Sequence, residues 1–158
     1  MLDTDLAWLA GLWDGEGSIT MFTHQEKNGS TKLCPTCVVV NTDIHIINKA
    51  RSLLEALECK FILHEFQPKK KEYKLQWRIT TRNMSYIKKF LTAVLPYLVG
   101  EKKAKGEILL SYVTQRLQKM ERFPSKGSTP YDEVDWAHFT AIRSSTTTRE
   151  GASAQDIV

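Results

Sequence analysis

Two carboxylates, Asp14 and Glu16, stand among glycines near the start of this 158-residue chain. The apolar residues before them recur at helical spacing and predict a helix that begins near residue 3. Both acids then fall at the carboxyl end of that helix, where the helix dipole disfavours negative charge by roughly 0.3–1 kcal/mol each. A glycine-flanked carboxylate at an electrostatically unfavourable position indicates a site for a cation.

The same helix is predicted to have two contrasting faces. An apolar face, typical of core packing, carries Leu6, Leu9 and Trp13. The other stripe combines small residues with one acid and consists of Ala7, Ala10, Gly11 and Asp14. Glycine inside a helix costs about 1 kcal/mol relative to alanine, so we expect a compensating role for this stripe. Small side chains let a second backbone approach closely, which favours packing against another helix.

Residues 9–17, with the sequence LAGLWDGEG, resemble the LAGLIDADG motif of the homing endonucleases. Glu16 fills the position of that family's metal-binding acid. Two departures are mild: Trp13 stands where a branched aliphatic residue is usual, and Gly15 where alanine or glycine is usual. The alternative interpretation is an ordinary helix end with incidental acids, but the remainder of the sequence also fits the family.

The resemblance implies a sequence-specific endonuclease that cleaves double-stranded DNA at a long pseudo-palindromic site and is encoded within an intron. It implies Mg²⁺ as the cofactor, for which Ca²⁺ or Mn²⁺ could substitute in the site. Metal binding is then assigned to Glu16 and to the backbone carbonyl of Gly15. Either Lys102 or Lys103 would stabilise the transition state, and Thr42 would position a water molecule.

Divalent ions supply what phosphodiester hydrolysis needs: an activated water, neutralised phosphate charge and a stabilised leaving oxygen. Mg²⁺ prefers few carboxylates together with waters and phosphate oxygens, so one acid per subunit is sufficient. The motif occurs once in the chain, and family members with a single motif act as homodimers. Two motif helices paired along Ala7, Ala10, Gly11 and Asp14 would bring both Glu16 carboxylates to the dimer axis.

The order of the predicted elements is helix, hairpin, helix, hairpin, helix, helix, which indicates an α+β fold with one antiparallel sheet. The resemblance refines this to an αββαββα fold whose saddle-like sheet carries its helices on one face. Asp43 and Asn83 are expected to cap the second and third helices. The predicted strands cover residues 18–25, 33–40, 60–66 and 73–80, and a long helix is predicted over residues 101–122.

The open face of this sheet is predicted to contact DNA. Residues of the last strand alternate strictly, with Tyr73, Leu75, Trp77 and Ile79 expected to face the helices. The expected DNA-facing residues are Ser18, Thr20, Phe22 and His24 in the first strand and Lys74, Gln76, Arg78 and Thr80 in the last. The basic turn Lys69, Lys70 and Lys71 would contact phosphates. A polar face alone is typical of any solvated sheet, so this prediction depends on the motif as well.

Charge is unevenly distributed along the chain. The net charge of +4 conceals a segment, residues 60–122, with 15 Lys/Arg against 5 Asp/Glu, a balance of +10. A basic block of this size indicates a polyanionic partner. The composition, 42% hydrophobic and 25% charged, is that of a globular domain.

Three cysteines, an odd number, argue against a disulfide framework and for a reducing intracellular compartment, either a prokaryotic cytoplasm or an organelle that encodes the protein. Cys34 and Cys37 have the spacing of a zinc knuckle, but a second pair is missing. Packed strand thiols are therefore favoured over a zinc site. No apolar run approaches the length of a membrane span, and no signal peptide or membrane partner is expected.

We expect a core domain over residues 1–123, followed by an extension over residues 124–158 with a short helix near residues 131–142 and a mobile tail. One competing function remains open, a non-cleaving nucleic-acid binder on the same fold, such as an RNA splicing maturase or a repressor. Glu16 favours the endonuclease, because a binder does not need an acid at an unfavourable helix end.

Overall fold

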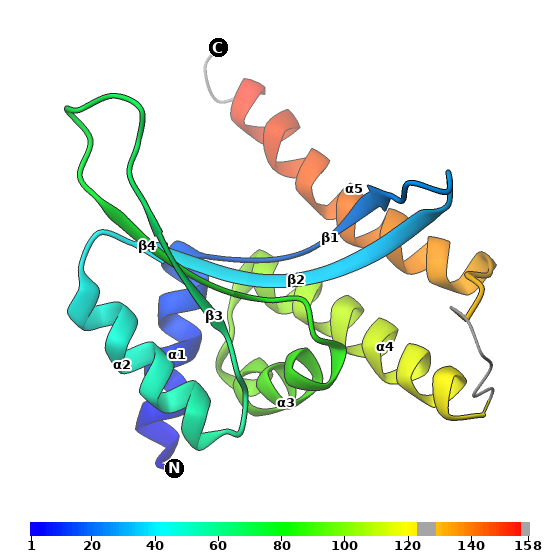
Figure 1. The fold of residues 1–158 in the computed structure, drawn as a ribbon, viewed down its shortest axis with the longest axis horizontal. Coiled ribbons are helices and arrows are strands. Elements are labelled where there is room, and N and C mark those ends of the chain that lie inside the picture. Colours follow the sequence, from blue (N-terminus) through cyan, green and yellow to red (C-terminus); the bar gives the residue numbers. More distant parts are fainter. Residues whose placement is uncertain (123–128, 156–158) are drawn as a thin grey trace.

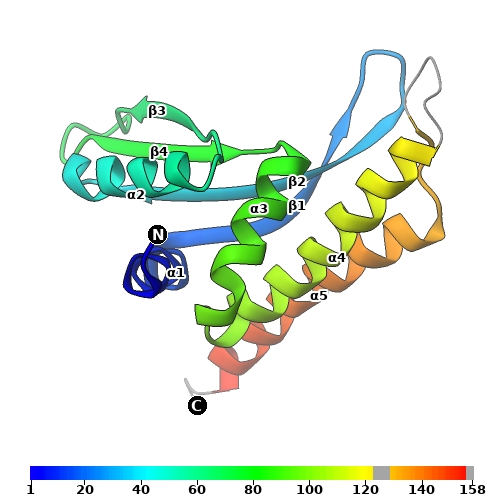
Figure 2. The same ribbon diagram turned by 90° about the horizontal axis from the view of Figure 1, so that it is seen from below.

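The computed structural model describes residues 1–122 and 129–155, with side chains described up to residue 144. In this part of the chain, four strands form one antiparallel sheet and helices α1 to α4 cover one of its faces (Figures 1 and 2). The elements are α1 (Asp3–Glu16), β1 (Gly17–Gln25), β2 (Thr31–Asn41), α2 (Ile44–Ala56), β3 (Ile62–Phe66), β4 (Gln76–Thr81), α3 (Met84–Val94), the 3₁₀ helix η1 (Leu95–Tyr97), α4 (Gly100–Arg122) and α5 (Glu133–Gln155). The predicted α+β fold with the order αββαββα is confirmed, and α5 is added to it.

The strand order is β1-β2-β4-β3, so two hairpins join along β2 and β4. In the first hairpin Gly17 pairs with Val39 and Gln25 with Thr31. Gly29 closes its turn with a φ of 84°, a left-handed conformation that glycine adopts without steric penalty. The long β1–β2 hairpin curves away from the helices at one end of the sheet, and the β3–β4 loop rises at the other end (Figure 1). The open face is therefore concave.

The core lies between the sheet and the helices. Alternate residues of β1, Ile19 and Met21, are fully buried against the helices, as the alternation predicted. Trp13 of α1 packs at its centre, with ring centroids 4.6 Å from Phe90 and 5.8 Å from Phe61. These tilted and edge-on arrangements are the favoured geometries of aromatic pairs. The core face of α1 and that of α3 thus meet in one aromatic cluster.

Helices α2 and α3 begin at the predicted caps. The Asp43 carboxylate accepts a hydrogen bond of 2.9 Å from the His45 backbone N–H, and the Asn83 side chain accepts one of 3.1 Å from Tyr86. Each bond satisfies a backbone donor that the first turn of a helix leaves unpaired. Both cap predictions are confirmed.

The fourth strand is shorter than predicted. It begins at Gln76, because the Tyr73 backbone N–H bonds to the Lys70 carbonyl in a local turn (3.1 Å) and not to a neighbouring strand. Tyr73 is 57% exposed, so its predicted place in the core is wrong. Lys74 belongs to the loop between β3 and β4 and not to the strand. The alternation holds from Gln76 onward, where Ile79 is buried and Arg78 is exposed.

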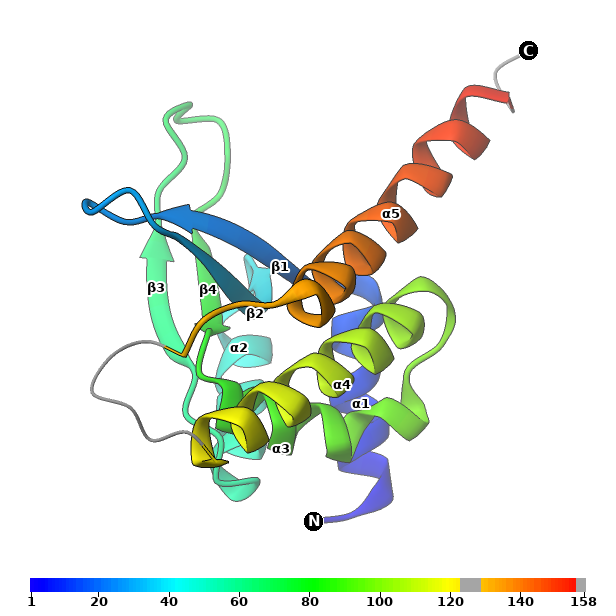
Figure 3. The same ribbon diagram turned by 90° about the vertical axis from the view of Figure 1, so that its right-hand side faces the viewer.

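The carboxyl-terminal extension also differs from its prediction. Helix α5 runs over 23 residues and includes positions that were expected to form a tail, so the prediction of a short helix is wrong. It packs against α4 and contacts β1, an edge strand of the sheet (Figures 1 and 3). The expected domain boundary at residues 123–124 falls outside the described residues. No helix in the described part of the chain is long and apolar enough to cross a membrane.

A buried arginine fastens the extension to α4. The Arg116 guanidinium is 5% exposed, donates to the Pro130 carbonyl at 2.8 Å and lies 3.4 Å from the Asp135 carboxylate. Its guanidinium carbon lies 4.2 Å from the centre of the Tyr131 ring. A buried charge is tolerated only when it is paired. The Arg116 contacts therefore hold the start of α5 in one position against α4.

A second ion pair at the same joint predicts a pH dependence of stability. Hydrogen bonds from Lys119 and from backbone N–H groups lower the pKa of the Asp132 carboxyl to about 2. Because the folded pKa lies below the unfolded value, this contribution to stability is present above the unfolded pKa and is lost as the pH falls through the folded pKa. Asp132→Asn should therefore lower the melting temperature at pH 7, and its difference from the wild type should shrink between pH 4 and pH 2. Thermal unfolding at several pH values measures this.

The control for this effect is Glu133→Gln, which removes a neighbouring exposed acid and should leave the pH profile unchanged. A melting-temperature difference for Asp132→Asn that stayed constant down to pH 2 would contradict the role of the Lys119 pair.

Gly17 is required by its neighbour Trp13. A Cβ atom at Gly17 would lie 2.5 Å from Cδ1 and 2.8 Å from Cα of Trp13, closer than real contacts allow. A Cβ atom at Gly15, in contrast, would meet nothing within 4 Å. Gly17→Ala should lower the free energy of unfolding by about 1–3 kcal/mol through overpacking, whereas Gly15→Ala should be neutral or stabilising in a helix. Urea unfolding of the two variants tests this, and equal stabilities would contradict it.

Candidate active site and nucleic-acid interface

Glu16 lies at the junction between the first helix and the sheet. It is the last residue of α1, its side chain is exposed, and β1 begins at the next residue. Thr42 follows the end of β2 and is also exposed. Because β1 and β2 are antiparallel and Gly17 pairs with Val39, both residues stand at the same end of this strand pair. The structure therefore brings Glu16 and Thr42 to one end of the sheet.

The second acid of the motif, Asp14, has a structural contact. Its carboxylate accepts a hydrogen bond of 3.0 Å from the backbone N–H of Val99, which precedes α4. Its backbone carbonyl accepts a bond of 2.7 Å from the Lys102 ammonium. Asp14 therefore joins α1 to the start of α4 and leaves Glu16 as the more available carboxylate.

Lys102 compensates the electrostatics of the helix end. The last turn of α1 contains no basic residue, and the Lys102 ammonium bound there supplies the positive charge that a helix carboxyl end favours. A cleft beside this contact is lined by Asp14, Gly15, Val99, Glu101 and Lys102. Lys103 is exposed and does not line the cleft. The two lysines that the sequence left as alternatives therefore differ in the structure, because only Lys102 lines the cleft.

The acidic groups suit a hard cation with few protein ligands. In the described part of the chain, no three His, Cys, Asp or Glu side chains form a metal-binding group. One exposed carboxylate and a nearby backbone carbonyl fit Mg²⁺, which takes its remaining ligands from water and phosphate. The same donors do not fit a structural zinc site, which requires four ligands.

The cysteines behave as packed thiols. Cys34 and Cys37 are both free, and they point to opposite faces of β2 because they are three residues apart. Burial raises the pKa of the Cys37 thiol above its usual range and that of Cys59 to about 11. Two thiols on opposite faces of one strand cannot ligate a single metal ion together. The expected packed strand thiols are therefore confirmed for Cys37, and a zinc knuckle finds no support among the described residues.

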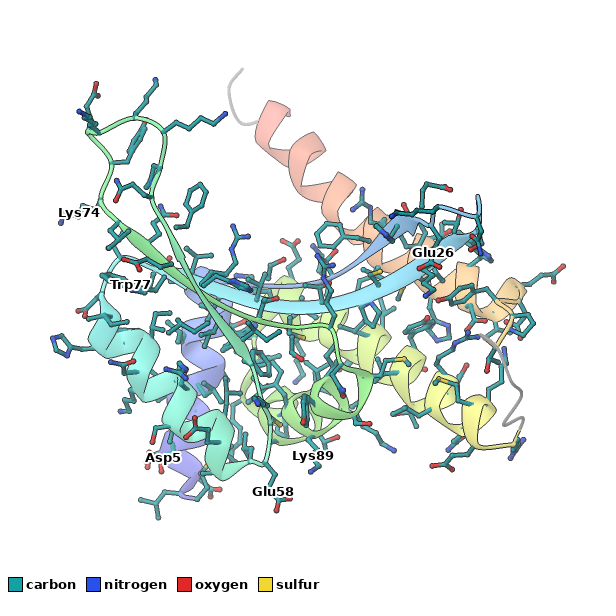
Figure 4. All side chains as sticks on the ribbon, in the orientation of Figure 1. Asp5, Glu26, Glu58, Lys74, Trp77 and Lys89 are labelled. Atoms are coloured by element: carbon teal, nitrogen blue, oxygen red, sulfur yellow. The ribbon has the colours of Figure 1, made fainter. Side chains whose placement is uncertain are left out.

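The predicted DNA-facing residues lie on the open side of the sheet or on its loop. On β1 these are Ser18, Thr20, Phe22 and His24, which alternate with the buried residues of that strand; on β4 they are Gln76, Arg78 and Thr80. The basic turn and Lys74 occupy the exposed loop between β3 and β4 (Figure 4). The exposed Arg78 forms no ion pair among the described residues, so its guanidinium is available to a ligand. Together these side chains form a concave face with a basic rim.

Residues 3–94, more than half of the chain, match the model of the LAGLIDADG-like domain. The chain belongs to the LAGLIDADG family. A comparison with curated protein sequences gave no match.

Solved structures with the LAGLIDADG fold resemble this chain over most of its length. The homing endonuclease I-CvuI in complex with the I-CreI target is 15% identical, with a TM-score of 0.57 over 92% of this chain and 94% of that one. The archaeal intron-encoded homing endonuclease I-Vdi141I, complexed with DNA, is 12% identical, with a TM-score of 0.57 over 92% and 98% of the two chains. The meganuclease I-SmaMI, bound to uncleavable DNA, is 18% identical, with a TM-score of 0.58 over 89% of this chain and 42% of that one. At these identities the likeness shows a shared fold.

The LAGLIDADG helix presents a narrower contact stripe than predicted. Ala10 is fully buried in the core of its own chain, so its assignment to a dimer interface is wrong. It lies beside Leu9 and one turn before Trp13, close enough to the apolar face to be covered by it. Ala7 and Gly11 are exposed, and a Cβ at Gly11 would meet nothing within 4 Å. The exposed stripe is therefore Ala7, Gly11 and the half-buried Asp14.

Proposed function

We propose that this LAGLIDADG protein is an intron-encoded, homodimeric endonuclease that hydrolyses both strands of a long pseudo-palindromic DNA site with Mg²⁺. One observation carries the proposal: the exposed Glu16 carboxylate lies where α1 ends and β1 begins. It therefore stands at the end of the strand whose open face is proposed to read DNA, and a scissile phosphate at this junction would meet the acid directly.

The residues around Glu16 have distinct roles in this proposal. The Glu16 carboxylate and the Gly15 backbone carbonyl hold Mg²⁺, which can be replaced by Ca²⁺ or Mn²⁺. When bound, the ion activates water and neutralises phosphate charge. Thr42 holds a water molecule by its hydroxyl group, and the Lys102 ammonium lies beside the cleft where negative charge develops on the phosphate. Lys103 remains a more exposed alternative for the same electrostatic role.

Dimer formation follows from the single motif. Each chain supplies one Glu16, so two scissile phosphates require two copies. The exposed face of α1 at Ala7 and Gly11 has little side-chain bulk, which allows two such helices to pack closely about a two-fold axis. The spacing between the two metal sites is then set by helix packing.

DNA binding has two independent supports. The concave sheet face and its loop carry the lysine and arginine residues that a polyanion requires, and residues 60–122 have the balance of +10 given above. The structures of I-CvuI and I-Vdi141I, which share the fold, are complexes with DNA. I-CvuI was also crystallised with its target in 2 mM Ca. These complexes support the binding of a DNA duplex by this chain.

A non-cleaving binder on this fold, an RNA maturase or a repressor, is the second candidate. It would use the same sheet face but would not require an exposed carboxylate at the end of α1. Glu16 therefore favours cleavage over binding alone.

The proposal is tested with a random-sequence library of duplex DNA. Incubation with the protein and Mg²⁺ should yield a family of double-strand breaks at one long, approximately palindromic sequence, and recovery of the cut ends identifies it. The same library incubated with EDTA is the control and should remain intact. A library that is bound but never cut in Mg²⁺ or Mn²⁺ would favour the maturase or repressor.

Lys102 and Lys103 provide a direct test of the electrostatic role. Lys102→Ala should reduce the cleavage rate by about 10²-fold, the usual effect of removing one group that stabilises developing charge. Lys103→Ala should reduce it far less, because Lys103 does not line the cleft. Single-turnover cleavage of the selected site measures both rates. Thermal unfolding controls for the helix-capping role of Lys102, and a larger loss for Lys103→Ala would transfer the role to that residue.

A further inference from the structure

The concave sheet face carries large apolar side chains among its polar ones. Its exposed hydrophobic side chains come from β1 and β3: Phe22 is 44% exposed, Ile62 58% and Phe66 48%. Val38 and Val40 of β2 lie between them and are half-buried. Large exposed apolar groups clustered on one face mark an interaction surface. This apolar band consists of Phe22, Val38, Val40 and Ile62.

Strand register places Val38, Val40 and Ile62 in two neighbouring rows of the face, and Phe22, which pairs with Cys34, lies four residues farther along β1. Ser18, Val38, Thr80 and Ile62 lie in one row across all four strands. In the next row Val40, Arg78 and His64 lie side by side. A hollow of about 590 Å³ opens over these two rows. Each row thus combines one or two apolar side chains with two polar ones.

Two threonines of this hollow, Thr36 and Thr80, already use their hydroxyl protons within the chain. The Thr36 hydroxyl donates to the Cys34 carbonyl and the Thr80 hydroxyl to the Cys37 carbonyl, both at 3.3 Å. Their methyl groups therefore add to the apolar character of the face. Arg78, Arg82 and His64 are the charged or ring donors that line the hollow and can bond to a ligand. The face can therefore make apolar contacts with a ligand beside the hydrogen bonds that its arginines and histidine donate.

The charge around the band selects its partner. The basic loop between β3 and β4, with Lys69, Lys70, Lys71 and Lys74, borders one end, and Arg78 and Arg82 lie at the hollow itself. An apolar protein surface would leave these charges without partners, whereas a nucleic acid supplies phosphates for them. In the major groove of B-DNA the thymine C5-methyl is the one apolar group on a base edge. DNA that contains thymine therefore offers methyl groups to the apolar band and phosphates to the basic residues around it.

We infer that the apolar band reads thymines through their C5-methyl groups, so that target recognition depends on those methyls. This inference rests on the proposed DNA binding and adds the chemistry of the base edges that the protein selects. Hydrogen bonds from Arg78 and His64 supplement the methyl contacts in the neighbouring row. The selected site should accordingly contain thymines at the positions that each subunit covers with this band.

The test uses duplexes that lack single methyl groups. After selection of a bound site from a random-sequence library in Ca²⁺, each thymine is replaced in turn by deoxyuridine, which keeps every hydrogen-bonding group and loses only the methyl. At thymines facing the band, affinity should fall by about fourfold, the value for burial of one methyl-sized group. Equal affinity for all thymine and deoxyuridine duplexes, or selected sites without thymine, would overturn the inference.

Variants assign the effect to the band. Ile62→Ala and Phe22→Ala change exposed side chains, and each should remove the thymine preference at one position. Lys70→Ala is the matched control, which should weaken all duplexes alike and leave the ratio between thymine and deoxyuridine unchanged. An unchanged ratio in both band variants, or self-association that depends on Ile62, would overturn the inference while DNA binding persists. A protein that retains no duplex at all would overturn both proposals.

Discussion

Replacing Glu16 by glutamine should abolish DNA cleavage and leave DNA binding largely intact. The carboxylate is exposed at the end of α1, so the neutral and isosteric amide leaves the fold unchanged. Charge stabilisation by a bound divalent ion supplies several kcal/mol to hydrolysis, which corresponds to a loss of at least about 10³-fold in rate. Single-turnover cleavage in Mg²⁺ and equilibrium binding to the same duplex measure the two quantities separately.

Asp14→Asn is the matched control for this variant. Asp14 lies two residues earlier on the same helix end, but its carboxylate accepts a bond from the Val99 backbone, which an amide oxygen also accepts. Cleavage by Asp14→Asn should therefore remain within about tenfold of the wild type, since one neutral hydrogen bond replaces a charge-assisted one. The reverse pattern, an active Glu16→Gln and an inactive Asp14→Asn, would transfer metal binding to Asp14.

The secondary structure could be predicted because its signals are local. In α3, the apolar residues Ile87, Phe90, Leu91 and Val94 keep helical spacing and are all buried. In β1, strict alternation places Ile19 and Met21 in the core. Such periodicities predict which face of a helix or strand is buried, even when the element that packs against it is unknown. The fold class followed from these elements and their order.

The contacts of the candidate site could not be predicted in the same way. Lys102 donates a hydrogen bond to the Asp14 carbonyl although the two residues lie 88 positions apart in the sequence. No local sequence pattern predicts that pairing. This contact also changes the interpretation of the motif, because the helix end that lacked a positive charge receives one from α4. An acid at that end is thus less unfavourable than α1 alone suggests. We still expect a metal cation near this helix end, although the Lys102 ammonium already supplies part of the positive charge.

Burial at the edge of a face is equally hard to read from sequence. Ala10 was grouped with Ala7 and Gly11 because all three are small, yet only Ala10 is covered by the core. A small side chain indicates that another backbone can approach closely. It does not specify whether that backbone belongs to the same chain or to a second one. The apolar band on the open sheet face was missed for a related reason, since Val38 and Val40 belong to a continuous apolar strand whose two faces differ only in what covers them.

Replacing Gly11 by leucine should separate the proposed dimer into monomers and abolish cleavage. Within one chain the substitution is harmless: a Cβ at this position meets nothing within 4 Å, and leucine is a better helix former by roughly 0.5–1 kcal/mol. The monomer should therefore be as stable as the wild type or more stable. Between chains, the added side chain would keep two α1 helices apart and displace each Glu16 from its place across the two-fold axis. Sedimentation velocity and cleavage of the selected site measure the two effects.

A leucine added elsewhere on a helix surface distinguishes this effect from a general consequence of surface apolarity. Gln115 is exposed on α4, and Gln115→Leu should leave both the dimer and cleavage intact. Gly11→Ala is an intermediate case, in which one methyl group should weaken association without eliminating it, and higher protein concentration should restore cleavage by mass action. A monomeric wild type, or a Gly11→Leu protein that remains dimeric and active, would show that α1 is not the dimer contact. The two Glu16 carboxylates would then have to meet through another surface, or one chain would have to cut each strand alone.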